Sequence, residues 1–165
     1  MKRTKNKYRL PLNKKDIIWP KKKLPPHTDK DFKFAVDFLV SIGTSIFAAA
    51  SGKVVWVKDD SKVGGKEKKK YWDLGNRIVI KHKFGEYTAY EHLKYKGVIV
   101  KIEQKLKKGQ LIGYSGNTGW STIGPHLHFE VFIKPSKGES EGETIPFSFE
   151  NFPLEKYLID VYGKS

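Results

Sequence analysis

The chain has 165 residues and no cysteine, which excludes disulfides, thiolate metal ligands and a cysteine nucleophile. Hydrophobic residues make up 38% and aromatic residues 13% of it, which predicts a folded protein of one domain with a sizeable core. The 32 Lys and Arg against 18 Asp and Glu leave a net charge of +14, which favours polyanions such as nucleic acid, anionic lipid or teichoic acids. No zinc-finger spacing, RNP-like stretch or basic amphipathic helix accompanies this charge, so charge alone does not indicate a nucleic-acid-binding protein.

The beginning of the chain, "MKRTKNKYRLPLNKKDIIWPKKK", is strongly basic. It has the basic region of an export signal, but the apolar region that follows in such signals is missing. Either a signal has been removed, or export uses another route. Elsewhere, no apolar run approaches the roughly 20 residues that a membrane-spanning helix needs.

Strand patterns dominate the chain from residue 32 onward. The stretch "FKFAVDFLV" (32–40) alternates between an apolar face and a face that carries Asp37, and it predicts the first strand. Further strands are predicted in the ranges 45–57, 76–82, 86–93, 97–102, 109–116 and 126–133. Long polar loops are predicted at 58–76 and 134–144, and a single short helix at 153–162. Closely spaced strands joined by turns predict one mainly β, mostly antiparallel domain.

The stretch "GPHLHFEVFI" (124–133) places two histidines one residue apart. In a strand, His126, His128 and Glu130 share one face, because residues two apart point the same way. The other face is apolar and carries Leu127, Phe129, Val131 and Ile133. Two imidazoles on one face suit a metal site or proton transfer. The segment alone favours a structural interpretation, in which one histidine caps a turn and the other forms a hydrogen bond in a half-buried sheet.

Three other residues have positions that suit chemistry. His27 follows "LPP" on a loop before the first strand, and Asp37 lies among apolar neighbours, where a charged carboxylate is costly unless it is paired, exposed or bound to a metal. By alternation, His92 shares a strand face with Tyr90. Taken singly, each has a structural explanation: a solvated loop residue, a salt-bridged strand residue and a hydrogen bonder at a strand end.

Taken together, these segments resemble a known family. The stretches "HTDKDFKFAVDF", "YEHL" and "GQLIGYSGNTGWSTIGPHLHFEVF" resemble, in order and spacing, the lysostaphin-like (LytM-type) zinc endopeptidases of bacterial peptidoglycan. The stretches "SIGTSIFAAASGKVVWV" and "GNRIVIKHKFGEYTAYEHL" are similar to hairpins of that family. The resemblance covers about residues 26–134. It implies a single-domain antiparallel β-sheet with an open groove, built from a duplicated hybrid motif with long loops.

The resemblance also implies a division of the chain and a set of site residues. The division is a basic N-terminal extension (1–25), a zinc peptidase core (26–135) and a C-terminal extension with a short helix (136–165). The implied ligands of a single zinc ion are His27, Asp37 and His128. The implied catalytic residues are His92 and His126. Two imidazoles and one carboxylate leave an open position on zinc, as catalytic sites require. We assign His126 as the base and His92 as the group that stabilises the oxyanion, although the sequence does not separate the two roles.

Two departures from the family pattern affect this assignment. Nine residues separate His27 from Asp37, where the best-known members have far fewer. Asp29 and Asp31 are therefore alternative ligands, although neither has the "AVDF" context of Asp37. Ile123 is a one-residue insertion in the turn before the HLH motif, and we expect it to reshape that turn without moving the histidines.

Four neighbouring residues receive weaker assignments. Glu91 and Glu130 are candidates to orient an imidazole, but we favour an exposed position for Glu91 and a structural role for Glu130. Tyr90 is a candidate hydrogen-bond donor in the groove. His82 has no matching role and is expected to be structural.

The resulting expectation is a zinc-dependent endopeptidase that hydrolyses peptide bonds in peptidoglycan cross-links or stem peptides. Its expected partners are peptidoglycan peptides and anionic wall polymers, and it is expected to act as a monomer outside the cytoplasm, in the cell envelope. One alternative is a non-catalytic relative that binds the wall or activates an amidase, but such relatives typically lack ligands and all are present here. A basic nucleic-acid-binding β domain is the other, and only charge supports it. The bond that is cleaved stays open.

Overall fold

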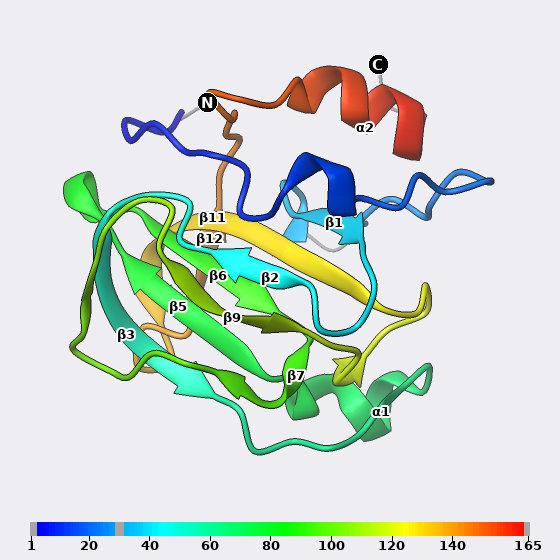
Figure 1. Cartoon of the computed structure of the whole chain (residues 1–165), viewed down its shortest axis with the longest axis horizontal. Coiled ribbons are helices and arrows are strands. Elements are labelled where there is room, and N and C mark those ends of the chain that lie inside the picture. Colours follow the sequence, from blue (N-terminus) through cyan, green and yellow to red (C-terminus); the bar gives the residue numbers. More distant parts are fainter. Residues whose placement is uncertain (1–2, 29–31, 164–165) are drawn as a thin grey trace.

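The large sheet of the molecule is mainly antiparallel and carries most of its strands (Figure 1). The computed structural model describes residues 3–28 and 32–163. The strand order is β1–β11–β6–β5–β3–β8, and β12 pairs with β11. The bounds are β1 (Val36–Leu39), β3 (Gly52–Lys58), β5 (Arg77–Lys81), β6 (Tyr87–Glu91), β8 (Lys105–Leu106), β11 (His126–Ser136) and β12 (Glu141–Thr144).

Two smaller sheets and a few short helices complete the described structure. An antiparallel sheet has the order β2 (Ser45–Phe47), β9 (Leu111–Ser115) and β7 (Leu93–Val98), and β10 (Gly119–Trp120) pairs in parallel with β4 (Gly64–Gly65). The helices are α1 (Lys68–Tyr71) and α2 (Leu154–Tyr162), with 3₁₀ turns η1 (Lys14–Asp16), η3 (Trp72–Leu74) and η4 (Lys83–Gly85). The predicted mainly β, antiparallel fold and the C-terminal helix are confirmed. Within the described ranges, no helix has the length and apolar character needed to cross a bilayer.

The structure corrects several predicted element boundaries. The first strand is shorter than predicted, because residues 32–34 form a turn in which the Ala35 N–H donates to the Phe32 carbonyl at 2.9 Å. The predicted strand at 97–102 is wrong beyond Val98, and Ile99 and Ile102 are about half exposed there, at 51% and 53%. Val100 is buried in the core, so the apolar residues of that stretch are only partly buried.

Both predicted loops contain regular structure. The range 58–76 includes β4, α1 and η3. In the range 134–144, β11 continues to Ser136 and β12 begins at Glu141, so the segment is largely a hairpin. Their polar composition reflects exposure on the surface rather than an absence of secondary structure.

The hydrophobic core includes residues of the large sheet, of the β2–β9–β7 sheet and of both ends of the chain. As predicted, Leu127, Phe129 and Val131 on β11 face this core and are fully buried. Leu10 near the N-terminus and Tyr157 on α2 are almost fully buried in the same cluster. Burying a large apolar side chain stabilises a fold by about 1.5–3 kcal/mol. The two predicted extensions therefore contribute to the stability of the sheet that they cover.

His82 is a buried histidine whose ring is fully engaged by neighbours. Its Nδ1 lies 2.9 Å from the Ser51 carbonyl oxygen, and its Nε2 lies 2.8 Å from the Thr88 hydroxyl. Burial lowers the pKa of His82 from 6.5 to about 4. His82 does not line the groove described below, in keeping with its expected structural role.

We expect His82 to make the fold less stable as the pH falls from 6.5 to 4. The unfolded chain takes up a proton on His82 first, because the folded pKa is lower, so about 3 kcal/mol of stability is lost over this window and none below it. The measurement is urea unfolding at pH 7 and pH 4 with a chelator present, for the native chain and His82→Gln. Between pH 7 and pH 4, the free energy of unfolding of the variant should fall by about 3 kcal/mol less than that of the native chain. An equal fall in both would contradict the assignment.

Candidate metal centre

The strand register aligns four charged or ionisable side chains across the large sheet. Asp37 on β1 lies opposite His128 on β11, and His128 lies opposite Glu91 on β6. Glu91 in turn lies opposite Arg77 on β5. Cross-strand partners project from the same face of a sheet with their Cβ atoms about 5 Å apart. The register therefore builds one continuous polar row on the face opposite the main core.

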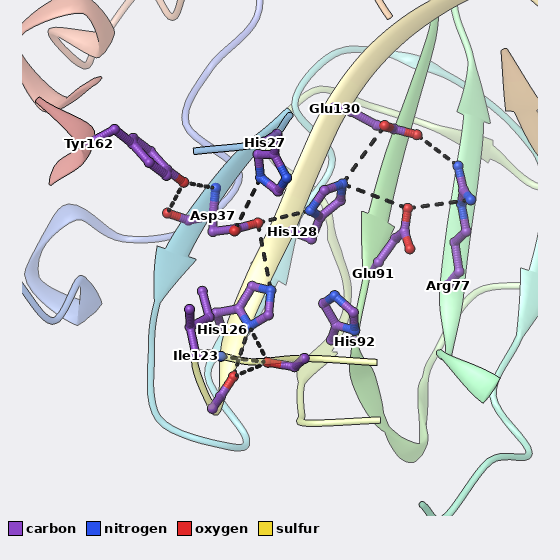
Figure 2. Close-up of polar contacts among 12 residues, drawn as sticks. His27, Asp37, Arg77, Glu91, His92, Ile123, His126, His128, Glu130 and Tyr162 are labelled. Atoms are coloured by element: carbon purple, nitrogen blue, oxygen red, sulfur yellow. Dashed lines mark hydrogen bonds and ion pairs between the residues drawn. The ribbon is translucent and has the colours of Figure 1, made fainter. Parts of the chain in front are cut away.

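His27, Asp37 and His128 meet at one end of this row (Figure 2). His27 Nε2 lies 3.1 Å from Asp37 Oδ2, and His128 Nδ1 lies 2.8 Å from Asp37 Oδ1. One nitrogen or oxygen atom from each of the three residues lies within 4.8 Å of the others. The structure thus brings together the three residues that the resemblance implied as ligands. The alternative ligands Asp29 and Asp31 lie outside the described residues.

The donor atoms of this cluster fit a metal ion. His27 Nε2 is buried, and its contact with Asp37 Oδ2 at 3.1 Å lacks the geometry of a hydrogen bond among the described residues. A buried polar atom without a partner is rare in a folded protein unless a ligand or water completes it. Two imidazole nitrogens and a carboxylate oxygen are a typical set of protein ligands for a catalytic zinc site. His128 also belongs to two further groups that could hold a metal. One contains His92 and His126, and the other contains Glu91 and Glu130.

The ionisation of Asp37 is set by the imidazoles around it. Burial raises the pKa of Asp37, but the charge of His126, the hydrogen bond to His128 and the close contact with His27 outweigh burial and hold the pKa well below 3.8. Burial lowers the pKa of His128, but the bond to Asp37 outweighs it and raises the pKa well above 6.5. Without a metal, the cluster therefore holds a carboxylate whose charge is balanced by a proton on His128.

His92 and His126 form a second pair beside the cluster, with ring centroids 4.4 Å apart. His126 Nδ1 lies 2.8 Å from the Gly124 carbonyl oxygen, and His92 Nδ1 lies 2.7 Å from the Thr118 carbonyl oxygen. A carbonyl oxygen only accepts, so each Nδ1 carries the hydrogen and each neutral ring keeps Nε2 as an acceptor. Burial lowers the pKa of both rings, to about 3 for His92, where the charge of His126 adds to the effect. Both rings are therefore neutral at pH 7.

The backbone at His92 explains how this residue reaches the groove. Strand β6 ends at Glu91, and His92 has a φ of 61°, a left-handed conformation that is uncommon outside glycine and that occurs at functional sites. The simple alternation that placed His92 and Tyr90 on one face is therefore wrong. Tyr90 lies in the core, where its hydroxyl accepts a hydrogen bond of 2.8 Å from the Ala49 N–H. Tyr90 is not a donor in the groove.

Arg77 connects two carboxylates next to His128 (Figure 2). It lies 2.8 Å from Glu130 and 3.3 Å from Glu91, and each glutamate has an oxygen 3.8–3.9 Å from His128 Nε2. Burial raises the pKa of Glu91, but Arg77 and the neighbouring imidazoles lower it overall. The expected exposed position of Glu91 is wrong, because it belongs to this cluster. Arg77 was missed in the sequence, where nothing marks it as the partner of Glu91.

A groove with a cavity of about 570 Å³ opens over the histidines. One side is an aromatic wall of Phe32, Trp72 and Trp120, with ring centroids 5.7 Å apart for Phe32 and Trp72 and 5.6 Å apart for Trp72 and Trp120. The Lys68 ammonium lies 4.5 Å and 5.0 Å from the two tryptophan rings. Trp72 comes from the predicted loop at 58–76, so that loop forms part of the groove wall. The sequence did not single out any of the three aromatic residues.

Comparison with known proteins shows the family to which the chain belongs. The profile of Peptidase family M23 matches residues 31–140, and the chain belongs to this family. Its relatives include an uncharacterised metalloprotease of Buchnera aphidicola (38% identical over 68% of this chain), the peptidoglycan DD-endopeptidase ShyA of Vibrio cholerae (33% over 77%) and lysostaphin of Staphylococcus staphylolyticus (37% over 69%). This chain covers only 24%, 25% and 21% of their respective lengths.

Solved structures of M23 peptidases share the fold. A catalytic-domain variant of the prophage-encoded M23 protein EnpA from Enterococcus faecalis is 29% identical, with a TM-score of 0.55 over 75% of this chain and 82% of that one. The catalytic domain of lysostaphin from Staphylococcus simulans is 32% identical, with a TM-score of 0.52 over 74% of this chain and 85% of that one. The resemblance to lysostaphin-like peptidases is therefore confirmed.

We expect Arg77→Met to destabilise the fold strongly. Arg77 is 8% exposed, and its loss leaves two facing carboxylates without their cation, which typically costs about 3–5 kcal/mol for a buried pair. The measurement is the free energy of unfolding in urea. Lys134→Met is the matched control, since Lys134 pairs with Glu143 at 2.5 Å on the exposed surface and should cost less than about 1 kcal/mol. Similar costs for the two variants would contradict the interpretation.

Proposed function

We propose that this chain is a zinc-dependent endopeptidase that hydrolyses peptide bonds in peptidoglycan cross-links or stem peptides. The observation that carries the proposal is the cluster of His27, Asp37 and His128 beside the pair of His92 and His126 in one open groove. A complete ligand set next to two neutral imidazoles suits hydrolysis. It also argues against the alternative of a non-catalytic, wall-binding or amidase-activating relative.

His27, Asp37 and His128 are the proposed ligands of a single zinc ion. Bound zinc supplies Lewis acidity, which lowers the pKa of a water molecule and polarises the carbonyl group of the substrate. The polar row behind His128 supports this assignment, because Glu91 and Glu130 place carboxylate oxygens 3.8–3.9 Å from Nε2, the ring nitrogen that points away from Asp37. Carboxylates in that position orient a metal-binding imidazole.

His126 is the proposed proton acceptor. Its neutral ring is held by the Gly124 carbonyl and keeps Nε2 as a free acceptor near the cluster, 3.6 Å from Asp37 Oδ1. In this position, His126 takes the proton of the attacking water and passes it to the leaving amine. Ser121 and the turn that contains Ile123 hold the ring, with the Ser121 hydroxyl 3.4 Å from His126 Nδ1.

His92 is the proposed stabiliser of the developing oxyanion. The Thr118 carbonyl accepts from its Nδ1–H, so His92 can donate to an oxyanion only through a protonated Nε2. That proton would come from solvent, because the proton of the attacking water goes through His126 to the leaving amine, and the negative charge that develops on the substrate oxygen would favour the protonated ring.

The names of the relatives and the charge of the chain support peptidoglycan as the substrate. ShyA is named as a peptidoglycan DD-endopeptidase, and ALE-1 of Staphylococcus capitis is named as a glycyl-glycine endopeptidase. A net charge of +14 would concentrate the protein on anionic wall polymers. We accordingly propose action outside the cytoplasm, in the cell envelope, as a monomer. Nucleic-acid binding has only the charge in its favour.

The proposed function predicts metal-dependent release of peptides from purified peptidoglycan. The chain should hold about one zinc ion, lose it on His128→Ala, and lose its activity when a chelator is added. His126→Ala should keep the zinc ion but lower the rate about a hundredfold to ten-thousandfold, because it removes the proton acceptor. His82→Gln, a buried histidine outside the groove, should keep full activity at pH 7. Activity that survives zinc removal would overturn the proposal.

Mass spectrometry of the released fragments identifies the bond. Substrates with glycine bridges and substrates with direct cross-links should be digested side by side, each with a chelator control. Metal-dependent fragments from at least one of them are expected, and intact material from both would contradict the function proposed.

A further inference from the structure

Strand β1 lies at the edge of the large sheet, and its outer side is covered by other parts of the chain. In the described part of the protein, β1 pairs with β11 on one side only. On the other side, the Asp37 N–H donates to the Tyr162 hydroxyl at 2.8 Å (Figure 2). The Tyr157 hydroxyl donates to the Asp37 carbonyl oxygen at 2.8 Å. Two phenols from α2 thus occupy the place of a neighbouring strand.

The phenols satisfy backbone groups that are buried and otherwise unpaired. Asp37 is 5% exposed, and Tyr157 and Tyr162 are 1% and 8% exposed. Edge strands normally leave their outer N–H and C=O groups to water or to another chain. Here water is excluded, so the position of the Asp37 backbone depends on the two hydroxyl groups. The Asp37 carboxylate faces the two imidazoles of the proposed metal centre from this same backbone.

The last turn of α2 also holds the segment that leads to His27. The Leu24 N–H donates to the Val161 carbonyl at 2.9 Å, and the Lys23 ammonium donates to the carbonyls of Ile159, at 3.0 Å, and Asp160. The final carbonyls of a helix lack partners within the helix and attract cations. The chain that leads to His27 is therefore attached to α2 three residues before the histidine.

We propose that α2 is a brace that sets the distance between two metal ligands, His27 and Asp37, with Tyr157 and Tyr162 as positioning residues. The proposal rests on the metal centre of the proposed function. The brace lies outside residues 31–140, the range of the family match. It fixes one ligand through the edge of β1 and the other through Leu24. Neither tyrosine is one of the proposed ligands; both hydroxyls contact the backbone of Asp37, and the Tyr162 ring also lies 6.4 Å from the His27 ring.

The test is the affinity and geometry of the metal site in Tyr162→Phe, Tyr157→Phe and the double variant. Phenylalanine keeps the ring packing and removes only the hydroxyl. Zinc affinity is measured by competition with a chromophoric chelator, and geometry by the visible spectrum of the cobalt-substituted protein. Tyr162→Phe should weaken zinc binding about tenfold, as the loss of a group that orients a ligand typically does, and should shift the cobalt spectrum. The double variant should show a larger effect.

Tyr8→Phe is the matched control. Tyr8 is 0% exposed, and its hydroxyl donates to Glu86 at 2.8 Å, outside the groove. This variant should lose stability in urea but keep the native zinc affinity and cobalt spectrum. A purely structural role for α2 would make the Tyr162 and Tyr8 variants alike, with lower stability and an unchanged metal site, and that result would overturn the brace. Either single variant gives the answer if the double variant does not fold.

The outcomes also separate the brace from the function on which it rests. If the native chain binds no zinc, or His128→Ala binds it equally well, the metal centre itself is rejected. If the native chain binds zinc and His128→Ala does not, the metal centre stands. In that case, unchanged affinity and spectrum in the tyrosine variants reject the brace alone.

Discussion

The pairing of β1 with β11 is the constraint on which the site depends. It places Asp37 opposite His128, and a slip of one residue would turn the carboxylate towards the core. The apolar neighbours of Asp37 oppose such a slip, because Val36 and Phe38 are almost fully buried on the other face. Core packing therefore sets the register, and the register in turn sets the position of the polar groups.

The same row explains how so many ionisable groups tolerate burial. Signs alternate along it, from the Asp37 carboxylate through His128 to the paired glutamates and Arg77. Each charge has an opposite charge beside it, which offsets the cost of removing it from water. In the metal-free cluster, a proton on His128 supplies the positive charge next to Asp37. A divalent cation in the same place would displace that proton, so metal binding is coupled to proton release from His128.

Local sequence patterns predicted much of the fold and of the candidate site. The features that they missed depend on long-range contacts. Alternation alone predicted the buried face of β11 and the common face of His126 and His128, because both depend only on neighbours in one strand. It failed for His92, where a positive φ interrupts the period. Arg77 and Trp72 were missed because their roles depend on register and on the path of a loop. A single sequence does not specify either of these.

The contacts that hold the site residues in place are likewise partly local and partly long-range. The two proposed catalytic histidines, His92 and His126, are held by the backbone carbonyls of Thr118 and Gly124. The proposed ligands His27 and Asp37 are held by contacts with α2, more than 100 residues further along the chain. The backbone carbonyls lie closer to the histidines in the sequence, so their contacts depend on shorter segments. The contacts with α2 form only when the whole chain has folded. The wide spacing between His27 and Asp37 is therefore compatible with one metal centre, because contacts with α2 hold Asp37 and the segment that leads to His27.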